Sequence, residues 1–194
     1  MVDNIGAYHL ANNPRLSEPA RSNTFRFVVT DLDNIVRVGY SSDDTNQNAR
    51  IANAQELLEF SVAKMFLPAF TQEAITIRRG NSVMHAAGLP TFNDGSLVIN
   101  DYIGADGKSV LMAWQNLSYN VDTQMVGYMS DYKKNCWLIE YDPQYKIVRQ
   151  WILYGCWVKG ISQEDFDMEN GSKRMITATI SYDYAKMQLP DEEE

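Results

Sequence analysis

Strict alternation of apolar and polar residues near the C-terminus is the pattern that most constrains how this chain can fold. Residues 176–184 carry the apolar side chains Ile176, Ala178, Ile180, Tyr182 and Tyr184, and Thr, Ser or Asp stands between each pair. A period of two places one set of side chains on a core and the other in water or on a polar partner. The segment is therefore predicted to be a half-buried strand of an antiparallel sheet.

Similar patterns recur along the chain and predict further strands. These predicted strands cover residues 25–30, 57–66, 75–78, 81–87, 97–102, 137–141 and 147–158. Gly80 is a predicted hairpin turn between two of them. Val110, Leu111, Trp114 and Leu117 follow helical spacing behind a possible N-cap at Asp106. The predicted fold is mainly β: an antiparallel sandwich or barrel with one principal α-helix, whose strand edges must be closed, covered or paired.

Length and charge narrow the class of protein. The 194 residues suffice for one domain, and 17 basic against 25 acidic residues give a net charge of -8. A protein that coats nucleic acid is normally basic, so this balance argues against that class. The chain has no apolar run long enough to span a membrane, and its first residues do not form a signal peptide. We therefore expect no membrane insertion and synthesis in a cytoplasm.

The sequence contains only incomplete matches to catalytic and ligand-binding motifs. Gly107-Lys108-Ser109 ends like a phosphate-binding loop, but Tyr102 stands where that loop needs its first glycine. Asp165, Asp167 and Glu169 are spaced like calcium ligands, but Asn170 and Ile176 occupy the positions of the required glycine and glutamate. His9 and His85 have no metal-ligand spacing. We expect no cofactor, no metal and no catalysis.

The remaining reactive or charged residues have structural interpretations as well as functional ones. Cys136 and Cys156 are expected to be small core residues, with a disulfide or a reactive thiol as alternatives. The pairs Arg78-Arg79 and Lys133-Lys134 neutralise too few phosphates for nucleic-acid binding, and suit turns or salt bridges to a neighbouring subunit. The four tryptophans are expected mostly in the core, with sugar stacking by one of them left open.

The order and spacing of several segments resemble the tail tube proteins of contractile-tailed, myovirus-type bacteriophages. The segments that carry this resemblance are Glu18–Phe25, Phe60–Pro68, Arg78–Gly80, Ala113–Gln115, Tyr132–Lys134, Gly155–Val158 and Ile180–Tyr184. They extend from about residue 17 to residue 186, and no single one is diagnostic. Two features depart from the family pattern: the loop at 39–55 is longer than usual, and the arm before residue 17 is extended.

The resemblance implies a structural virion protein, made in the host bacterial cytoplasm and located in the tail. Homo-hexameric rings would stack into the inner tail tube, with the tail sheath protein outside. The tape-measure protein and, transiently, DNA would occupy the lumen, and the baseplate and tail terminator would bind the ends. The expected organisation is an N-terminal arm at 1–22, a tail tube-like β domain at 23–186 that includes the 39–55 loop, and an acidic tail at 187–194.

Site residues follow from this interpretation. Residues 75–103 are the candidate lumen-lining segment, with Ile75, Arg78, Arg79, Asn81, Asn100 and Asp101 as its marked positions. The arm and the 39–55 loop are the candidate ring-stacking contacts, marked by Tyr8, Leu10, Arg21, Tyr40, Asp43 and Asp44. Alternatives are a baseplate tube-initiator or tail terminator subunit of the same fold, a bacterial secretion-system tube protein, a carbohydrate-binding β-sandwich and a small hydrolase.

Overall fold

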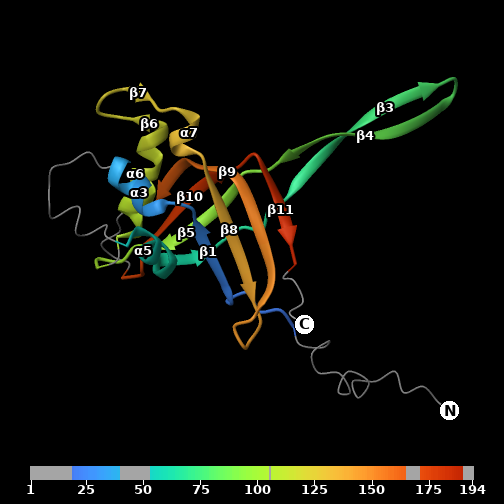
Figure 1. Ribbon diagram of the computed structural model, residues 1–194. Coiled ribbons are helices and arrows are strands. Elements are labelled where there is room, and N and C mark those ends of the chain that lie inside the picture. The colour runs from blue at the N-terminus through green and yellow to red at the C-terminus, as the bar shows by residue number, and fades with distance from the viewer. Residues whose placement is uncertain (1–18, 40–52, 105, 165–170, 190–194) are drawn as a thin grey trace, which may run out of the picture.

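A curled antiparallel sheet forms the body of the protein, and one long hairpin projects from it (Figure 1). The computed structural model describes residues 19–39, 53–104, 106–164 and 171–189. The strands are β1 (Phe25–Val29), β2 (Val62–Lys64), β3 (Phe70–Arg79), β4 (Ser82–Phe92), β5 (Gly95–Asn100), β6 (Tyr119–Asn120), β7 (Met125–Val126), β8 (Lys134–Tyr141), β9 (Ile147–Gln163), β10 (Met175–Ser181) and β11 (Tyr184–Gln188). The helices are α3 (Leu32–Gly39), α5 (Ala54–Ser61), α6 (Gly107–Ser118) and α7 (Met129–Tyr132).

Strand β9 lies at the centre of the sheet, whose order is β1-β8-β9-β10-β5-β2, with β11 also paired to β9. The first half of β9 pairs with β8 and β11, and its second half pairs with β10. Between the halves Gly155 has a φ of 66°, and an added Cβ would collide with the Asp183 carboxylate. Only glycine adopts this conformation readily, so Gly155 gives β9 the bend that curls the sheet.

The core forms where α6 packs against β9 and β5. The side chain of Asp106 caps this helix, since Oδ1 accepts a hydrogen bond from the Ser109 amide at 3.0 Å. Trp114 is fully buried, and its Nε1 donates to the Tyr132 carbonyl at 2.8 Å. In β10, Ile176, Ala178 and Ile180 are buried at every second position. The predicted cap, the three-turn helix and the alternation of the C-terminal strand are thus confirmed.

Helix α5 shields the open edge of β1. The Gln55 side-chain amide accepts from the Val29 N–H through Oε1 and donates through Nε2 to the Phe27 carbonyl, each at 3.0 Å. One side chain therefore makes the two backbone-directed bonds that a neighbouring strand would otherwise provide. Strands β1 and β2 lie at the two ends of the sheet order, and among the described residues they do not pair with each other. The curled sheet is therefore a half-barrel rather than a closed barrel.

Several sequence-based expectations need correction. Residues 57–66 are not one strand: α5 extends to Ser61, because Ala54, Leu58 and Ser61 are buried at helical spacing. The 39–55 segment ends in a helical turn, because residues 54–55 begin α5, and residues 40–52 lie outside the described part. Residues 187–188 end β11, so they belong to the sheet rather than to the acidic tail. The break between β10 and β11 also divides the strand expected over 176–184.

We predict that Gly155→Ala lowers the free energy of unfolding by about 1–3 kcal/mol, because alanine is strained at positive φ and its Cβ displaces Asp183. Urea unfolding followed by circular dichroism measures this change. Gly160→Ala in the same strand is the matched control, since its Cβ would meet no atom within 4 Å. Equal stability of the two variants would contradict the role assigned to Gly155.

Candidate assembly interface

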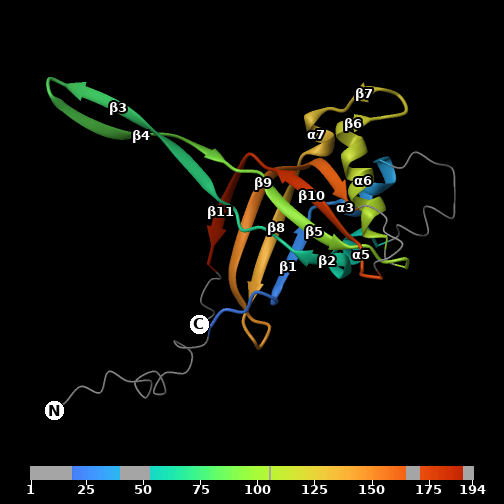
Figure 2. The same ribbon diagram turned by 180° about the vertical axis from the view of Figure 1, so that it is seen from behind.

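The hairpin of β3 and β4 stands clear of the body in both views (Figures 1 and 2). Its strands pair only with each other, in a ladder from Phe70–Phe92 to Arg79–Ser82. Every residue of β3 is exposed, and in β4 only Gly88 and Phe92 are partly buried. The outer edges of both strands therefore carry backbone groups that no strand of the described chain covers. An isolated two-stranded ribbon is at best marginally stable, so this element is suited to pairing with another chain.

One face of the hairpin is apolar. The cross-strand pairs Ile75–Ala86 and Ile77–Met84 lie on this face, and Ile75 and Met84 are each 55% exposed. The opposite face is more polar near the tip, where Thr76 lies opposite His85 and Arg78 lies opposite Val83. An exposed cluster of apolar side chains on a projecting ribbon is typical of an interaction surface.

The hairpin tip is basic. Arg78 and Arg79 end β3, and the two-residue turn Gly80-Asn81 leads into β4. Gly80 has a φ of 57°, which a glycine at the first central position of a tight hairpin turn provides. Neither guanidinium forms an ion pair with any residue that the structure describes.

An aromatic cluster fixes the base of the hairpin to the body. The Tyr182 ring lies 5.5 Å from that of Phe66 and 5.8 Å from that of Phe92, which in turn lies 5.5 Å from Phe70. The Tyr182 hydroxyl accepts a hydrogen bond from the Ala69 amide at 3.2 Å. Strand β10 is thereby joined through Tyr182 to both arms of the hairpin, and the direction in which the hairpin leaves the body is set by packing.

A surface ion pair lies beside this cluster. The Lys159 ammonium donates to the Asp94 carboxylate at 2.6 Å and holds the pKa of that carboxyl below its usual value. Phe66 also packs directly on Gly95, where a Cβ would find no room. No local sequence pattern marks this base, because its members come from three separate segments of the chain.

The predicted lumen-lining residues fall into two groups. The first group lies on the hairpin and consists of Ile75, Arg78, Arg79 and Asn81. Asn100 and Asp101 lie at the far end of β5, where Asp101 Oδ2 accepts from Arg174 Nε at 2.7 Å. The structure therefore does not bring the two groups together.

Among the predicted stacking contacts, Arg21 is exposed, and its carbonyl accepts a hydrogen bond from the Thr24 hydroxyl at 3.2 Å. The other five, Tyr8, Leu10, Tyr40, Asp43 and Asp44, lie outside the described residues.

The cysteines and the Gly107–Ser109 segment, which could in principle carry chemistry, have structural roles. Cys136 and Cys156 are both free and buried, and burial raises the pKa of the Cys136 thiol, which the neighbouring Cys156 raises further. A neutral buried thiol is a poor nucleophile, so the expected core role is confirmed. Gly107–Ser109 begins α6 behind the Asp106 cap. The acidic stretch 165–170 and His9 lie outside the described residues, and His85 lies on the hairpin.

Lys133 and Lys134 form ion pairs within the chain. Lys133 Nζ lies 2.7 Å from Asp183 Oδ1, and Lys134 Nζ lies 4.0 Å from Asp31 Oδ2. In the described segments no group of three or more His, Cys, Asp or Glu side chains is placed to hold a metal ion. None of the helices in those segments has the length and apolar content of a membrane span.

A groove of about 580 Å³ lies between residues 19–21 and the turn that joins β8 to β9. Two of its charged groups are paired, because Glu140 Oε2 lies 3.3 Å from Arg149 Nε. Among the described residues, the lining of the groove includes no cysteine, serine or histidine.

We predict that stability falls as the pH rises above about 10, the ordinary pKa of tyrosine, because burial raises the pKa of Tyr182 in the folded protein. The unfolded phenol ionises first, so the stabilisation is complete below that pH and is lost as the pH rises through the folded pKa. Urea unfolding between pH 8 and 11 measures the decline. Tyr182→Phe should show a shallower decline, and the exposed Tyr128→Phe should retain the original one.

Three comparisons place the chain among known proteins. A family model described as T4-like virus tail tube protein gp19 matches residues 23–186. Tail tube protein gp19 of Enterobacteria phage T4 is 22% identical over 159 residues, which cover 79% of this chain and 98% of the T4 protein.

Solved structures share the fold at lower identity. A chain of the extracellular contractile injection system PVC sheath-tube complex superposes with a TM-score of 0.59 at 13% identity, covering 95% of this chain and 98% of the other. A chain of the anti-feeding prophage baseplate gives 0.60 at 12% identity, covering 89% and 97%. A chain of the PVC sheath/tube terminator gives 0.61 at 13% identity, covering 89% and 99%. The mainly β prediction is confirmed, and the match over 23–186 shows that the chain belongs to the T4-like virus tail tube protein gp19 family.

Proposed function

We propose that this protein is the repeating subunit of the inner tube of a contractile phage tail. Six copies close into a ring, and rings stack into a hollow tube inside the sheath. DNA passes through the tube into the host, and the tape-measure protein occupies it beforehand. The protein acts by assembly and catalyses no reaction. Membership of a tail tube family supports the tube, and the six-fold symmetrised baseplate with the same fold supports a ring of six.

The proposal rests mainly on one observation: the hairpin is a two-stranded sheet, and no strand of the described chain pairs with either of its outer edges. Two strands, of ten and eleven residues, expose both outer edges and an apolar face. Strand β11 also has an outer edge that no strand of the described chain covers, because its ladder is made with β9 alone. Pairing of such edges between copies satisfies the backbone groups and removes apolar surface from water.

The small number of charged side chains on the hairpin is compatible with a lumen through which DNA passes. Between residues 70 and 92 the charged side chains are Glu73, Arg78 and Arg79, and the two arginines stand together at the tip. The remaining length of both strands carries little charge, and the whole chain has a net charge of -8. We propose that the strands contribute to a nearly neutral lumen wall around Ile75, and that the tip contacts another copy rather than the channel. A wall of this kind holds DNA weakly, because it offers few cations to the phosphates.

A baseplate initiator or a tube terminator of the same fold is the second candidate. The similarity to the PVC terminator and to the anti-feeding prophage baseplate favours it as much as the similarity to the sheath-tube complex favours the bulk subunit. Copy number distinguishes the two, because a bulk subunit fills many rings and an initiator or terminator fills one. Quantitative mass spectrometry of purified tails against the sheath protein measures this ratio.

We predict that concentrated full-length protein forms rings or tubes visible by negative-stain electron microscopy, and that Ile77→Ser with Met84→Ser abolishes them. The two changes remove the apolar face while leaving the body intact, so Tm should shift by only about 2 °C. Val83→Ser is the matched control, since Val83 is as exposed as Met84 but lies on the opposite face. A wild-type protein that stays monomeric at every concentration, also with purified baseplates as nuclei, would refute assembly.

A further inference from the structure

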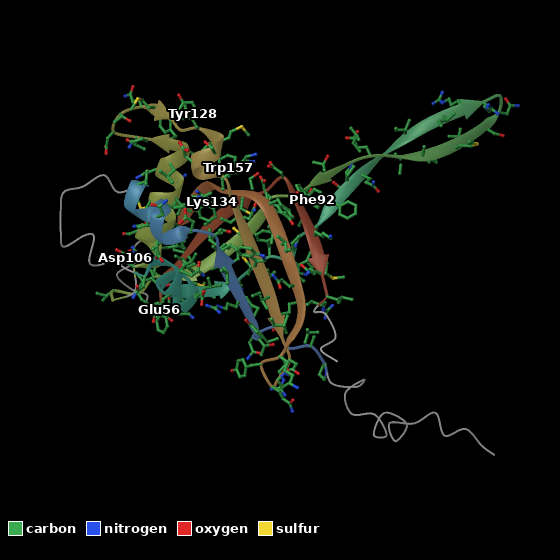
Figure 3. The ribbon with its side chains drawn as sticks, viewed as in Figure 1. Glu56, Phe92, Asp106, Tyr128, Lys134 and Trp157 are labelled. Atoms are coloured by element: carbon green, nitrogen blue, oxygen red, sulfur yellow. The ribbon has the colours of Figure 1, made fainter. Side chains whose placement is uncertain are left out.

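A second apolar surface lies at the end of the molecule opposite the hairpin. It consists of residues 119–129, the short β6–β7 ribbon and the start of α7, and is called the distal ribbon here. Its apolar side chains point outward: Val126 is 77% exposed and Tyr128 is 81% exposed, and Val121, Met125 and Met129 are each at least 60% exposed. Figure 3 shows Tyr128 on this outer surface, above α6. Such density of exposed apolar residues in eleven positions marks an interaction surface.

The distal ribbon is held in place by the core and is not a loose loop. The Gly127 amide donates to the Ser118 carbonyl at 3.1 Å, and the chain passes so close to Leu117 that no Cβ fits at Gly127. Asn120 Oδ1 accepts from the amides of Asp122 and Thr123 at 2.9 and 3.1 Å. The buried Trp114 anchors the end of α7 through the Tyr132 carbonyl. The apolar side chains are therefore presented outward by a fixed backbone.

The distal ribbon and the rest of α7 are also acidic, with Asp122 in the ribbon and Asp131 two residues beyond its end. Asp122 and Asp131 are exposed, and neither forms an ion pair with a residue that the structure describes. The cations that follow in the sequence, Lys133 and Lys134, pair with Asp183 and Asp31 instead. The distal ribbon and α7 thus combine exposed apolar side chains with two carboxylates that form no ion pair with a described residue, although Asp131 Oδ1 accepts a hydrogen bond from the Ser130 hydroxyl at 3.0 Å.

The hairpin tip has the complementary chemistry. Ile77 and Met84 lie on one face of the ribbon directly below Arg79, and Arg78 stands beside it. At about 3.3 Å per residue, ten residues of β3 reach roughly 33 Å from the body. Figures 1 and 2 place the tip and the distal ribbon on opposite sides of the molecule, so the two surfaces meet only between copies.

We propose that the hairpin tip of one copy docks on the distal ribbon of the next copy. Arg78 and Arg79 pair with Asp122 and Asp131, while Ile77 and Met84 near the tip pack on Val126. Two different patches meet head to tail, and such a contact closes a ring or propagates along an axis. The inference rests on the proposed assembly and names the surface that receives the hairpin.

Photo-cross-linking tests the contact directly. The full chain with p-benzoylphenylalanine in place of Ile77 is concentrated into assemblies, irradiated and digested with trypsin. The expected product joins the hairpin peptide to the peptide between Lys108 and Lys133, which contains the distal ribbon. Assemblies whose cross-links all lead to other peptides would overturn the docking surface and leave the tube proposal standing.

Charge reversal gives an independent test. Arg78→Glu with Arg79→Glu, and separately Asp122→Lys with Asp131→Lys, should each raise the concentration needed for sedimentable assembly about tenfold or more, because like charges then face each other. All four changes in one chain should restore assembly. Asp33→Lys with Glu56→Lys, on exposed acids of α3 and α5, is the matched control and should assemble normally.

The outcomes separate the two claims. Loss of assembly on changing the tip, with normal assembly on changing the ribbon and no rescue in the four-fold variant, overturns the docking surface alone. Failure of the unaltered chain to assemble overturns the proposed function. Circular dichroism melts of each variant confirm that the body is folded before assembly is scored.

Discussion

Backbone pairing along β9 is the constraint on which the rest of the body depends. This one strand bonds to β8 and β11 in its first half and to β10 in its second half, and the change of direction at Gly155 turns a flat arrangement into a curl. The concave space so created is filled by α6 and Trp114. Side-chain alternation in β8 and β10 then follows, because each strand turns one face to the same hydrophobic core.

The outer edge of β1 is covered, whereas the outer edges of the hairpin are not. In the body, Gln55 satisfies the outer backbone groups of β1, and a short helix covers that side. In the hairpin, every residue of β3 is exposed, and the last two carry guanidinium groups that form no ion pair with a residue that the structure describes. A monomer with one shielded and one unshielded region is consistent with a subunit whose fold is complete and whose assembly is not.

Local patterns in the sequence predicted the elements whose signals are local. The alternation around Ile176, the turn at Gly80 and the cap at Asp106 each depend on residues within one element, and each was placed correctly. The run from Leu57 to Phe66 was misassigned because a short apolar run fits both a strand and a buried helix. The base of the hairpin depends on packing between Phe66, Phe92 and Tyr182, which are far apart in the chain. The resemblance indicates the correct family. Asn100 and Asp101 are close to the hairpin in sequence, but they lie at the far end of β5 and not on the hairpin.

The aromatic base has a mechanical consequence. The hairpin is a lever about 33 Å long, and a tilt of 10° at its base moves its end by roughly 6 Å. A displacement of that size exceeds the reach of a hydrogen bond or an ion pair. The aromatic side chains packed around Tyr182 restrict this angle in the free subunit, before any neighbouring copy binds. The direction of the hairpin is therefore a property of the single chain. In the proposed tube, the regularity of the assembly would then depend on the packing of four aromatic side chains, Phe66, Phe70, Phe92 and Tyr182.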